Sequence, residues 1–530
     1  MVAVLLLAAA CGREETEPFG GDAVRSTLSS ATAGSTILLA GGDTVRISET
    51  TLEFYRGRHW QAAWMGSKGP LGRGVAVHEA IGAAWDDGLP PARYRYEVIT
   101  GLFAALEARG DARLSDSDAA QYRADLDILL TEGFNRLARD LVIGMIDPEQ
   151  AGLDQRIQQD EPPDGALLNR VVAGEAPGDL VATLRPSLPQ YERMRAALAA
   201  FRDVESRGQW VSIEADTTLR EGMRDASVAR LRARLAAGVN GEEADLARAG
   251  EADPARFDAD LVRAVQRFQI RHALEPDGIV GATTARELNH TVAEWIAELQ
   301  LNLDRWRWLP RHLGERYVLV NIAGFELEVV DGGRVIEAMN VVVGTELTET
   351  PIFADSIRYV VVNPYWNVPD GIMERTIAPA MARDPNYLRD HDMEMVDGRV
   401  RQRPGPQNSL GRYKFIFPNE FDVYLHDTPD GHLFARTERA FSSGCVRIER
   451  PRDFARMLLR LQSSQDPDTL DEILAAGAEQ WMALDRPLPV FLLYFTAWAQ
   501  EDGTVRFHHD VYGHDEAMGE QTVEMAQPGP

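Results

Sequence analysis

The chain has 530 residues, of which 45% are hydrophobic and 26% are charged, a composition typical of ordinary globular proteins. A chain of this length is too long for one hydrophobic core, and length alone predicts about three domains. The formal net charge of −27 argues against a nucleic-acid partner and against an anionic lipid surface, because both require clustered Lys and Arg. No stretch approaches the roughly 20 consecutive apolar residues that span a bilayer.

The N-terminal segment, residues 1–35, is predicted to be a signal peptide followed by a tether. Residues 2–10 form a short apolar run that ends in small residues, and Cys11 follows directly. A cysteine in this place resembles a bacterial lipoprotein signal, in which the cysteine is lipidated after cleavage. The alternative is an ordinary signal peptide, because Ala8 stands where lipoprotein signals usually have Leu. Both interpretations predict export to the periplasm. A lipid on Cys11 would be the only attachment to a membrane, and by analogy with bacterial lipoproteins this would be the outer membrane.

Cysteine occurs only at positions 11 and 445. If Cys11 is lipidated or removed, Cys445 has no partner for a disulfide. A lone thiol in an oxidising compartment is a hazard unless it has a purpose. The alternative is that Cys445 is a small buried hydrophobe, and the residues around it decide between the two.

Residues 36–225 are predicted to be a helical scaffold domain. The strongest signal in this segment is an amphipathic helix whose apolar residues recur at steps of three and four. These residues are Leu126, Leu129, Leu130, Phe134, Leu137 and Leu141. No cluster of titratable residues in the segment points to chemistry.

Residues 226–292 are predicted to form a compact unit of three helices. Apolar residues at helical spacing mark the first two helices. The turn Asp-Gly-Ile-Val-Gly of residues 277–281 precedes a third helix, which runs through Leu288. Three helices with such a turn resemble the peptidoglycan-binding domain of many cell-wall enzymes. That resemblance implies binding to peptidoglycan, and the alternative is a plain helical spacer.

Residues 293–314 are predicted to be a linker helix that ends at Pro310. The period then changes, and short β-branched runs predict a mostly β domain over residues 315–515. Residues from about 370–400 interrupt the strands and are interpreted as an inserted lid, and residues 516–530 as a polar tail. The predicted fold class is multidomain α+β, with a helical scaffold, a three-helix domain and a mostly β domain.

The residues that point to chemistry lie in one stretch of the β domain. His426 ends a predicted strand, and Cys445 follows in a loop, directly after the small residues Ser442, Ser443 and Gly444. A thiol is a good nucleophile as its thiolate, and a nearby imidazole can take the proton. The glycine lets the backbone approach a substrate, and the amides of Gly444 and Cys445 are candidates to hold an oxyanion.

Other residues of this stretch are given lesser roles. Tyr424 shares the strand face of His426 and is a candidate to line the site, with ordinary packing as the alternative. Asp427 is expected to point to the opposite face, so orientation of the imidazole is left to a backbone carbonyl. His432 is expected to be solvated. The histidines near the C-terminus lack a metal-ligand spacing, and neither a metal nor a cofactor is expected.

The stretch from His426 to Arg447 resembles the catalytic motif of the L,D-transpeptidase family, His…Ser-x-Gly-Cys-x-Arg. Large Gram-negative members are similar in the order of their domains and in three further segments, which are residues 363–369, 404–411 and 494–498. Many members have His where this chain has Ser443, so His426 is the only base available. The resemblance implies that Arg447 orients the loop or meets a substrate carboxylate, and an Arg that bonds loop carbonyls is the alternative.

The resemblance also implies the reaction. Cys445 is expected to attack the L-centred carbonyl of diaminopimelate in a tetrapeptide stem of peptidoglycan, to release D-Ala and to form a thioester. An amine of a second diaminopimelate then completes a cross-link, and carbapenems are implied as covalent inhibitors. One alternative is an L,D-carboxypeptidase that hydrolyses the same bond. Another is a wall-binding structural protein with an inactive catalytic domain, against which the intact motif argues.

Overall fold

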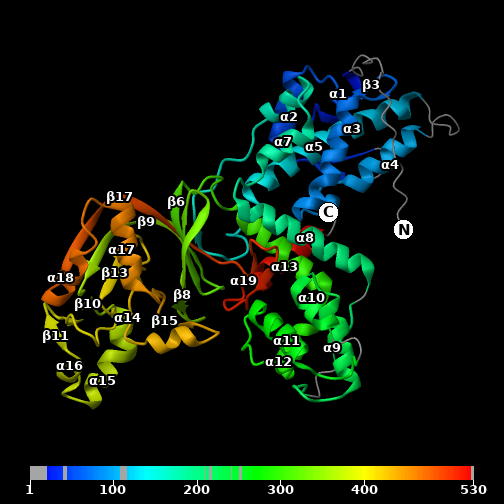
Figure 1. The fold of residues 1–530 in the computed structure, drawn as a ribbon. Coiled ribbons are helices and arrows are strands. Elements are labelled where there is room, and N and C mark those ends of the chain that lie inside the picture. Colours follow the sequence, from blue (N-terminus) through cyan, green and yellow to red (C-terminus); the bar gives the residue numbers. More distant parts are fainter. Residues whose placement is uncertain are drawn as a thin grey trace.

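The computed structural model describes residues 21–39, 44–107, 116–208, 210–213, 218–239, 241–249 and 253–526. The apolar N-terminal run and Cys11 therefore lie outside the described residues. Within the described part of the chain, no helix is both long and apolar enough to cross a membrane. Figure 1 shows the N-terminal helices in blue and cyan, the module of residues 226–292 in green below them, and the β domain on the opposite side of the molecule.

The N-terminal helical domain is built around one long helix, α5 (Asp116–Ile143). Its other helices are α1 (Asp22–Leu28), α2 (Glu49–Gly57), α3 (Gly72–Gly82), α4 (Tyr96–Glu107), α6 (Ala166–Val172) and α7 (Pro177–Leu184). Its short elements are β1 (Thr36–Leu38), β2 (Thr44–Arg46), β3 (Met65–Gly66), β4 (Gly69–Pro70), η1 (Ala83–Asp87) and η2 (Pro91–Tyr94). The apolar residues that predicted α5 are buried in the domain core, which confirms that helix.

This domain begins earlier than the sequence suggested. Val24 and Leu28, four residues apart on α1, are fully buried in the same core as α5. The tether interpretation is therefore wrong for α1. Its two apolar residues form too short a pattern to stand out in a segment otherwise rich in small and polar residues.

Helix α13 (Val292–Arg307), expected to be a linker, is buried between the domains (Figure 1). Its neighbours come from distant parts of the chain, namely α8 (Pro189–Arg207), β18 (Ala497–Ala499) and, through the ring pair of Trp295 and Phe507, β19 (Val505–Phe507). Trp306 of α13 stacks on Phe495 with 4.3 Å between ring centroids. The buried carboxylate of Asp304 accepts hydrogen bonds from the backbone N–H groups of Met145 and Ile146. Helix α13 thus fastens the helical domain to the β domain.

The module of residues 226–292 contains the three expected helices and one more. The expected helices are α9 (Ala226–Ala236), α11 (Ala259–Arg271) and α12 (Ala282–Leu288). The additional helix, α10 (Gly241–Arg248), packs against α9 and α11, and Glu243 on it pairs with Arg271 at 2.7 Å. Its buried apolar residues are two alanines, which explains why hydrophobic periodicity did not reveal it.

The β domain contains one large sheet that closes on itself. Its strands are β5 (Gln155–Arg156), β6 (Arg316–Asn321), β7 (Glu326–Asp331), β8 (Arg334–Gly344), β9 (Ile352–Val362), β13 (Tyr413–Ile416), β14 (Leu425–His426), β15 (Ala440–Ser442), β16 (Val446–Ile448) and β17 (Gln480–Leu493). The order is β13-β14-β16-β8-β7-β6-β17-β9-β5, and β13 also pairs with β9, which completes a ring. The predicted multidomain α+β fold is confirmed.

Helices cover this sheet. They are α17 (Pro451–Gln462), α18 (Thr469–Ala476) and the short η5 (Gly431–Ala435). Phe454 of α17 packs edge-on against Phe415 of β13, with 4.8 Å between ring centroids. Strand β5 comes from the scaffold segment and pairs in parallel with β9, so the chain crosses from the helical domain into the sheet before the β domain begins.

The segment interpreted as a lid is a small subdomain. Its elements are β10 (Trp366–Asn367), α14 (Asp370–Ile372), η4 (Met373–Ile377), α15 (Ala378–Arg383), α16 (Tyr387–Asp390), β11 (Met393–Val396) and β12 (Arg399–Gln402). The strands form a separate three-stranded sheet. Trp366, Ile377 and Met393 are buried in its own core, and Tyr424 of the β domain packs against that core. The subdomain therefore lies beside the predicted site.

The C-terminal segment forms a helix, α19 (His514–Ala526). Met518 on it is fully buried, and Asp515 forms an ion pair with Arg305 of α13 at 2.5 Å. The polar-tail interpretation is therefore wrong for residues up to 526. A buried methionine, the ion pair with Arg305 and hydrogen bonds from the N–H groups of His514 and Asp515 to Asp510 hold this helix, whose composition is otherwise that of a solvated segment.

Candidate active site

Three neighbouring strands bring the predicted site residues onto one face of the large sheet. His426 of β14 lies opposite Lys414 of β13 on one side and beside Arg447 of β16 on the other. The same register places Tyr424 beside Cys445, one step along the strands. Laterally paired residues point to the same face, and side chains alternate along a strand. The shared face therefore carries Lys414, Tyr424, His426, Cys445 and Arg447.

His426 is held as a neutral imidazole with one free nitrogen. The residue is 5% exposed, and its Nδ1 lies 2.5 Å from the backbone oxygen of Asp427. A carbonyl only accepts, so Nδ1 carries the proton and Nε2 is left as an acceptor. Burial, helped by the charges of Arg447 and Lys414, lowers the pKa of His426 to about 3. The backbone carbonyl of Asp427 therefore orients the imidazole. The carboxylate of Asp427 instead accepts a hydrogen bond from the backbone N–H of Arg412.

The Cys445 thiol is the neighbour of His426 without being bonded to it. Its Sγ donates to the backbone oxygen of Asp422 at 3.8 Å, and Tyr424 interacts with the sulfur through its N–H and its hydroxyl. Among the described residues, Sγ forms no hydrogen bond with the imidazole. Diagonal positions on neighbouring strands are about 7–8 Å apart, and contacts between a nucleophile and its base are often long before substrate binds. The thiol and the imidazole therefore lie on the same sheet face without a direct hydrogen bond among the described residues.

The loop before Cys445 is held by hydrogen bonds that correct one expectation. Gly444 has a φ of +110°, a conformation that favours glycine. Its N–H donates to Ser442 Oγ at 3.1 Å, and that hydroxyl donates to the Cys445 carbonyl at 2.6 Å. The Gly444 amide is therefore occupied, and the oxyanion role expected of it is not supported. Within the described chain the Cys445 N–H has no hydrogen-bond acceptor, and Ser443 is exposed.

Two residues that the sequence did not reveal brace this loop. Thr350 Oγ1 donates to the Gly444 carbonyl at 2.8 Å, and it accepts from the Gly344 N–H at 2.9 Å. The Tyr512 hydroxyl donates to the Gly344 carbonyl at 2.7 Å and accepts from the Thr350 N–H at 3.2 Å. Tyr512 is in turn bonded through its N–H to Tyr494, which lies in a segment that carried the family resemblance. The C-terminal part of the β domain thus supports the loop of residues 442–445.

Arg447 connects the nucleophile strand to the turn after His426. Its Nη1 donates to the carboxylate of Asp430 at 3.2 Å. Its Nε is buried and has no hydrogen-bond partner among the described residues. Of the roles expected from the sequence, orientation of the loop agrees with the ion pair to Asp430. The unbonded Nε leaves a donor for a substrate carboxylate.

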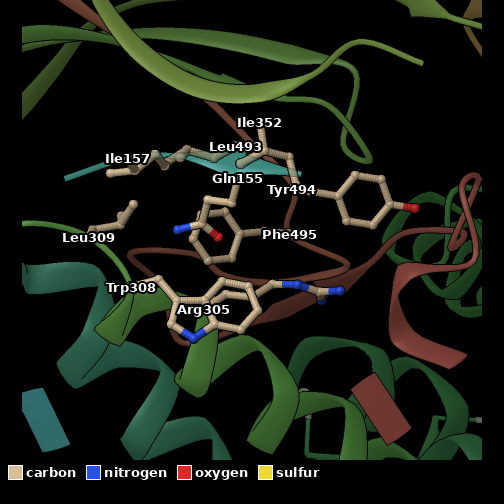
Figure 2. A pocket seen from close by; sticks show the side chains of 9 residues that line it. All are labelled: Gln155, Ile157, Arg305, Trp308, Leu309, Ile352, Leu493, Tyr494 and Phe495. Atoms are coloured by element: carbon tan, nitrogen blue, oxygen red, sulfur yellow. The ribbon is translucent and has the colours of Figure 1, made fainter. Parts of the chain in front are cut away.

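The hollow drawn in Figure 2 is not this site. It lies where β5, α13 and the end of β17 meet, and Gln155, Trp308 and Phe495 are among the side chains that line it. Its volume is about 10 Å³, which is room for about one water molecule. It contains none of the predicted site residues and is a packing gap between the helical and β domains.

The free thiol is expected to be less reactive at neutral pH than an ordinary cysteine. Burial raises the pKa of the Cys445 thiol, although Tyr424, Lys414 and Arg447 act in the opposite direction. Only the thiolate reacts with iodoacetamide, so alkylation should be slow near pH 7 and should still increase above about pH 9. The rate is measured by mass spectrometry on a chain with Cys11→Ser, with glutathione as reference. A plateau below about pH 8 would contradict this assignment.

Three family descriptions match successive parts of the chain. Residues 49–198 match "Scaffold domain", residues 224–288 match "Putative peptidoglycan binding domain", and residues 315–471 match "L,D-transpeptidase catalytic domain". The last of these spans includes the five residues of the shared sheet face.

Two similar proteins carry the name of an L,D-transpeptidase. A curated protein of Haemophilus influenzae, named "Putative L,D-transpeptidase", is 34% identical over 254 residues, which are 44% of this chain and 50% of that protein. The chain thus covers about half the length of this relative. An L,D-transpeptidase structure from Mycobacterium smegmatis is 12% identical, with 34% of this chain and 58% of that chain covered and a TM-score of 0.18, too low to inform the fold. Residues 315–471 thus match an L,D-transpeptidase catalytic domain, and along the chain this match follows matches to a scaffold domain and a peptidoglycan-binding domain.

Proposed function

We propose that this protein is a peptidoglycan L,D-transpeptidase in which Cys445 is the nucleophile and His426 is the general base. The observation that carries the proposal is the placement of a thiol beside a neutral, oriented imidazole on adjacent strands of one sheet face. An imidazole whose Nδ1 is bonded to a carbonyl can accept a proton only at Nε2. This is the form a base needs when its partner thiol is protonated at rest.

In the first half-reaction, the Cys445 sulfur forms a bond to the L-centred carbonyl carbon of diaminopimelate in a tetrapeptide stem. The thiol proton passes to Nε2 of His426 as the sulfur attacks. The C–N bond to the terminal D-Ala then breaks, and the proton passes from His426 to the leaving amine. The products are free D-Ala and a thioester between the stem and Cys445, so atoms and charge balance.

In the second half-reaction, an amine of another diaminopimelate attacks the thioester carbonyl. Neutral His426 takes a proton from this amine, the C–S bond breaks, and the proton returns to the departing sulfur. An amide cross-link forms and the enzyme is restored. Each tetrahedral intermediate carries an oxyanion, and the unbonded N–H of Cys445 supports its stabilisation.

The surrounding residues have assignable parts in this proposal. The Tyr424 hydroxyl and N–H interact with the sulfur and favour the thiolate as it develops. Ser442 shapes the loop through the bonds to Gly444 and Cys445. Arg447 holds the turn at Asp430, and its free Nε is available to the stem. Peptidoglycan lies in the cell envelope, which agrees with the export expected from residues 2–10; lipidation of Cys11 is part of the same proposal.

The experiment that tests the function separates transfer from hydrolysis. Purified enzyme with disaccharide-tetrapeptide should yield mainly cross-linked dimer and free D-Ala, with tripeptide in the minority, as chromatography with mass spectrometry would show. The lid subdomain packs against Tyr424 and is placed to exclude water from the thioester. Tripeptide almost alone, at high substrate concentration, would establish the carboxypeptidase alternative in place of the transferase.

Lid packing gives this test a matched pair of variants. Ile377→Ala removes a buried side chain from the lid core and should shift the products severalfold towards tripeptide. Met395→Ala removes an exposed apolar side chain from the same subdomain and should leave the ratio of products unchanged. If the ratio of products is unchanged in both variants, the packing of the lid does not determine whether water or an amine accepts the acyl group.

A further inference from the structure

Lys414 is a cation beside the reacting groups to which the motif assigns no role. Among 55 Lys and Arg residues, lysine occurs only at positions 68 and 414. Lys414 lies directly opposite His426 on the neighbouring strand, on the side away from Arg447. Its side chain is half-buried, and its Nζ lies 3.8 Å from the centroid of the Tyr424 ring. Because the hydroxyl of that ring interacts with the Cys445 sulfur, one tyrosine connects the ammonium to the nucleophile.

This ammonium has no acidic partner in the described chain. No carboxylate of the described residues forms an ion pair with Lys414, whose recorded contact is the ring face of Tyr424. The nearby carboxylate of Glu479 is engaged by the N–H of Tyr365 at 2.8 Å. Burial lowers the pKa of the Lys414 ammonium, as expected for a positive charge that is only partly compensated. Such a cation favours an anionic ligand.

The chemistry of the proposed reaction supplies a carboxylate at this position. The leaving amine takes its proton from His426, so the D-Ala that departs lies at the level of His426 in the sheet. The carbon that bears this amine also bears the carboxylate of D-Ala. Neighbouring strands are about 4.8 Å apart, so a carboxylate next to His426 is within reach of the strand that carries Lys414. Arg447 lies on the other side of His426, where its Nη1 is paired with Asp430 and its Nε is left for another group of the stem.

We propose that Lys414 binds the carboxylate adjacent to the reacting amine, first that of the departing D-Ala and then that of the acceptor. This inference rests on the transpeptidase function proposed above. The acceptor amine of diaminopimelate also lies on a carbon that carries a carboxylate, so a single cation serves both half-reactions. Water offers no carboxylate, and the same contact therefore favours transfer over hydrolysis.

The test compares two donors and three variants. One donor is the disaccharide-tetrapeptide with its terminal carboxylate, and the other is the same compound with a terminal carboxamide. The variants are Lys414→Met, Lys414→Arg and, as a matched control, Lys68→Met, which removes the exposed lysine of the helical domain. Steady-state kcat/KM for D-Ala or D-alaninamide release is measured with each, together with the ratio of dimer to tripeptide. Thermal unfolding reports whether each variant is folded.

Wild type and Lys68→Met should prefer the carboxylate donor by about tenfold to a hundredfold, the range for a hydrogen bond to a charged group. Lys414→Met should lose that preference by losing rate on the carboxylate donor alone, and should form less dimer relative to tripeptide. Lys414→Arg should keep part of the preference. If Lys414 had only a structural role, Lys414→Met would lower kcat/KM for both donors by the same factor.

Two outcomes overturn the inference, and a third overturns the proposed function on which it rests. A folded Lys414→Met that retains the wild-type preference shows that Lys414 does not bind this carboxylate. A Lys414→Met whose preference is intact while its iodoacetamide alkylation at Cys445 slows shows that the lysine acts on the thiol. Failure of wild type to process either donor would instead contradict the proposed function itself, and that result is distinguishable because it precedes any comparison between variants.

Discussion

Replacing Cys445 with alanine is expected to lower turnover of the tetrapeptide on the order of 10⁴-fold or more while the fold is kept. In the proposed mechanism the thiol forms the covalent bond, and in the structure Sγ donates a hydrogen bond to the Asp422 carbonyl at 3.8 Å. Alanine removes little packing at a half-buried position directly before β16. The same variant should form no adduct with a carbapenem, whereas wild type should form one adduct, as a thioester at Cys445.

Cys11→Ser is the matched control, because it removes the chain's other cysteine and leaves the loop of Ser442 to Cys445 intact. It should retain the wild-type rate and the single carbapenem adduct. Intact-protein and peptide mass spectrometry locate the adduct, and circular dichroism checks the fold. A folded Cys445→Ala enzyme near the wild-type rate, or an adduct that persists in it, would remove Cys445 from the mechanism.

Local sequence carried the predictions for the parts of the site that are close together in the chain. The resemblance of the stretch from His426 to Arg447 to a catalytic motif predicted Cys445 as nucleophile and His426 as base, and these roles stay predictions. Alternation along one strand predicted that Tyr424 shares the face of His426, and the register agrees. Local patterns could not show which of the two amides, Gly444 or Cys445, is free to hold an oxyanion. That depends on the Ser442 hydroxyl, which accepts from the Gly444 N–H.

Residues that reach the site through strand pairing or from distant segments were not predictable in this way. Lys414 faces His426 only because β13 pairs with β14 in one particular register. The N–H of Thr350 donates to the hydroxyl of Tyr512 across 162 residues of sequence, and both residues also form a hydrogen bond with the backbone of Gly344. Their hydroxyls are of a type found everywhere on protein surfaces, and only the closure of the fold gives them partners at the nucleophile loop.

The fold shows the same division. Helix α5 and the change to strand periodicity in the β domain carry long apolar patterns, and both were predicted. Helices α1 and α19 each depend on one or two buried apolar residues, Val24 and Leu28 in the first and Met518 in the second. The composition of such segments predicts solvated chain. Their stability comes from docking onto other elements, which local sequence does not encode.

Replacing His426 with alanine is expected to lower kcat/KM by about 10²–10⁴-fold, the usual contribution of a general base. The pH dependence makes this prediction sharper. Burial lowers the pKa of His426 from 6.5 to about 3, so the imidazole is neutral and able to accept a proton across about pH 5 to 8. The wild-type acid limb should therefore lie well below pH 6.5. In His426→Ala, only the preformed thiolate can attack, and the residual rate should rise with pH towards the raised pKa of the Cys445 thiol.

His432→Ala is the matched control, because His432 is an exposed histidine six residues away and lies on η5. It should leave both the rate and the pH profile unchanged. Folding must be monitored at each pH, since an unfolded histidine binds a proton below pH 6.5 whereas folded His426 does not until about pH 3. The unfolded state thus binds more protons in this interval, and stability falls as the pH drops through it. A wild-type acid limb near pH 6.5 in fully folded enzyme, or a flat profile in His426→Ala, would show that a different group is the base.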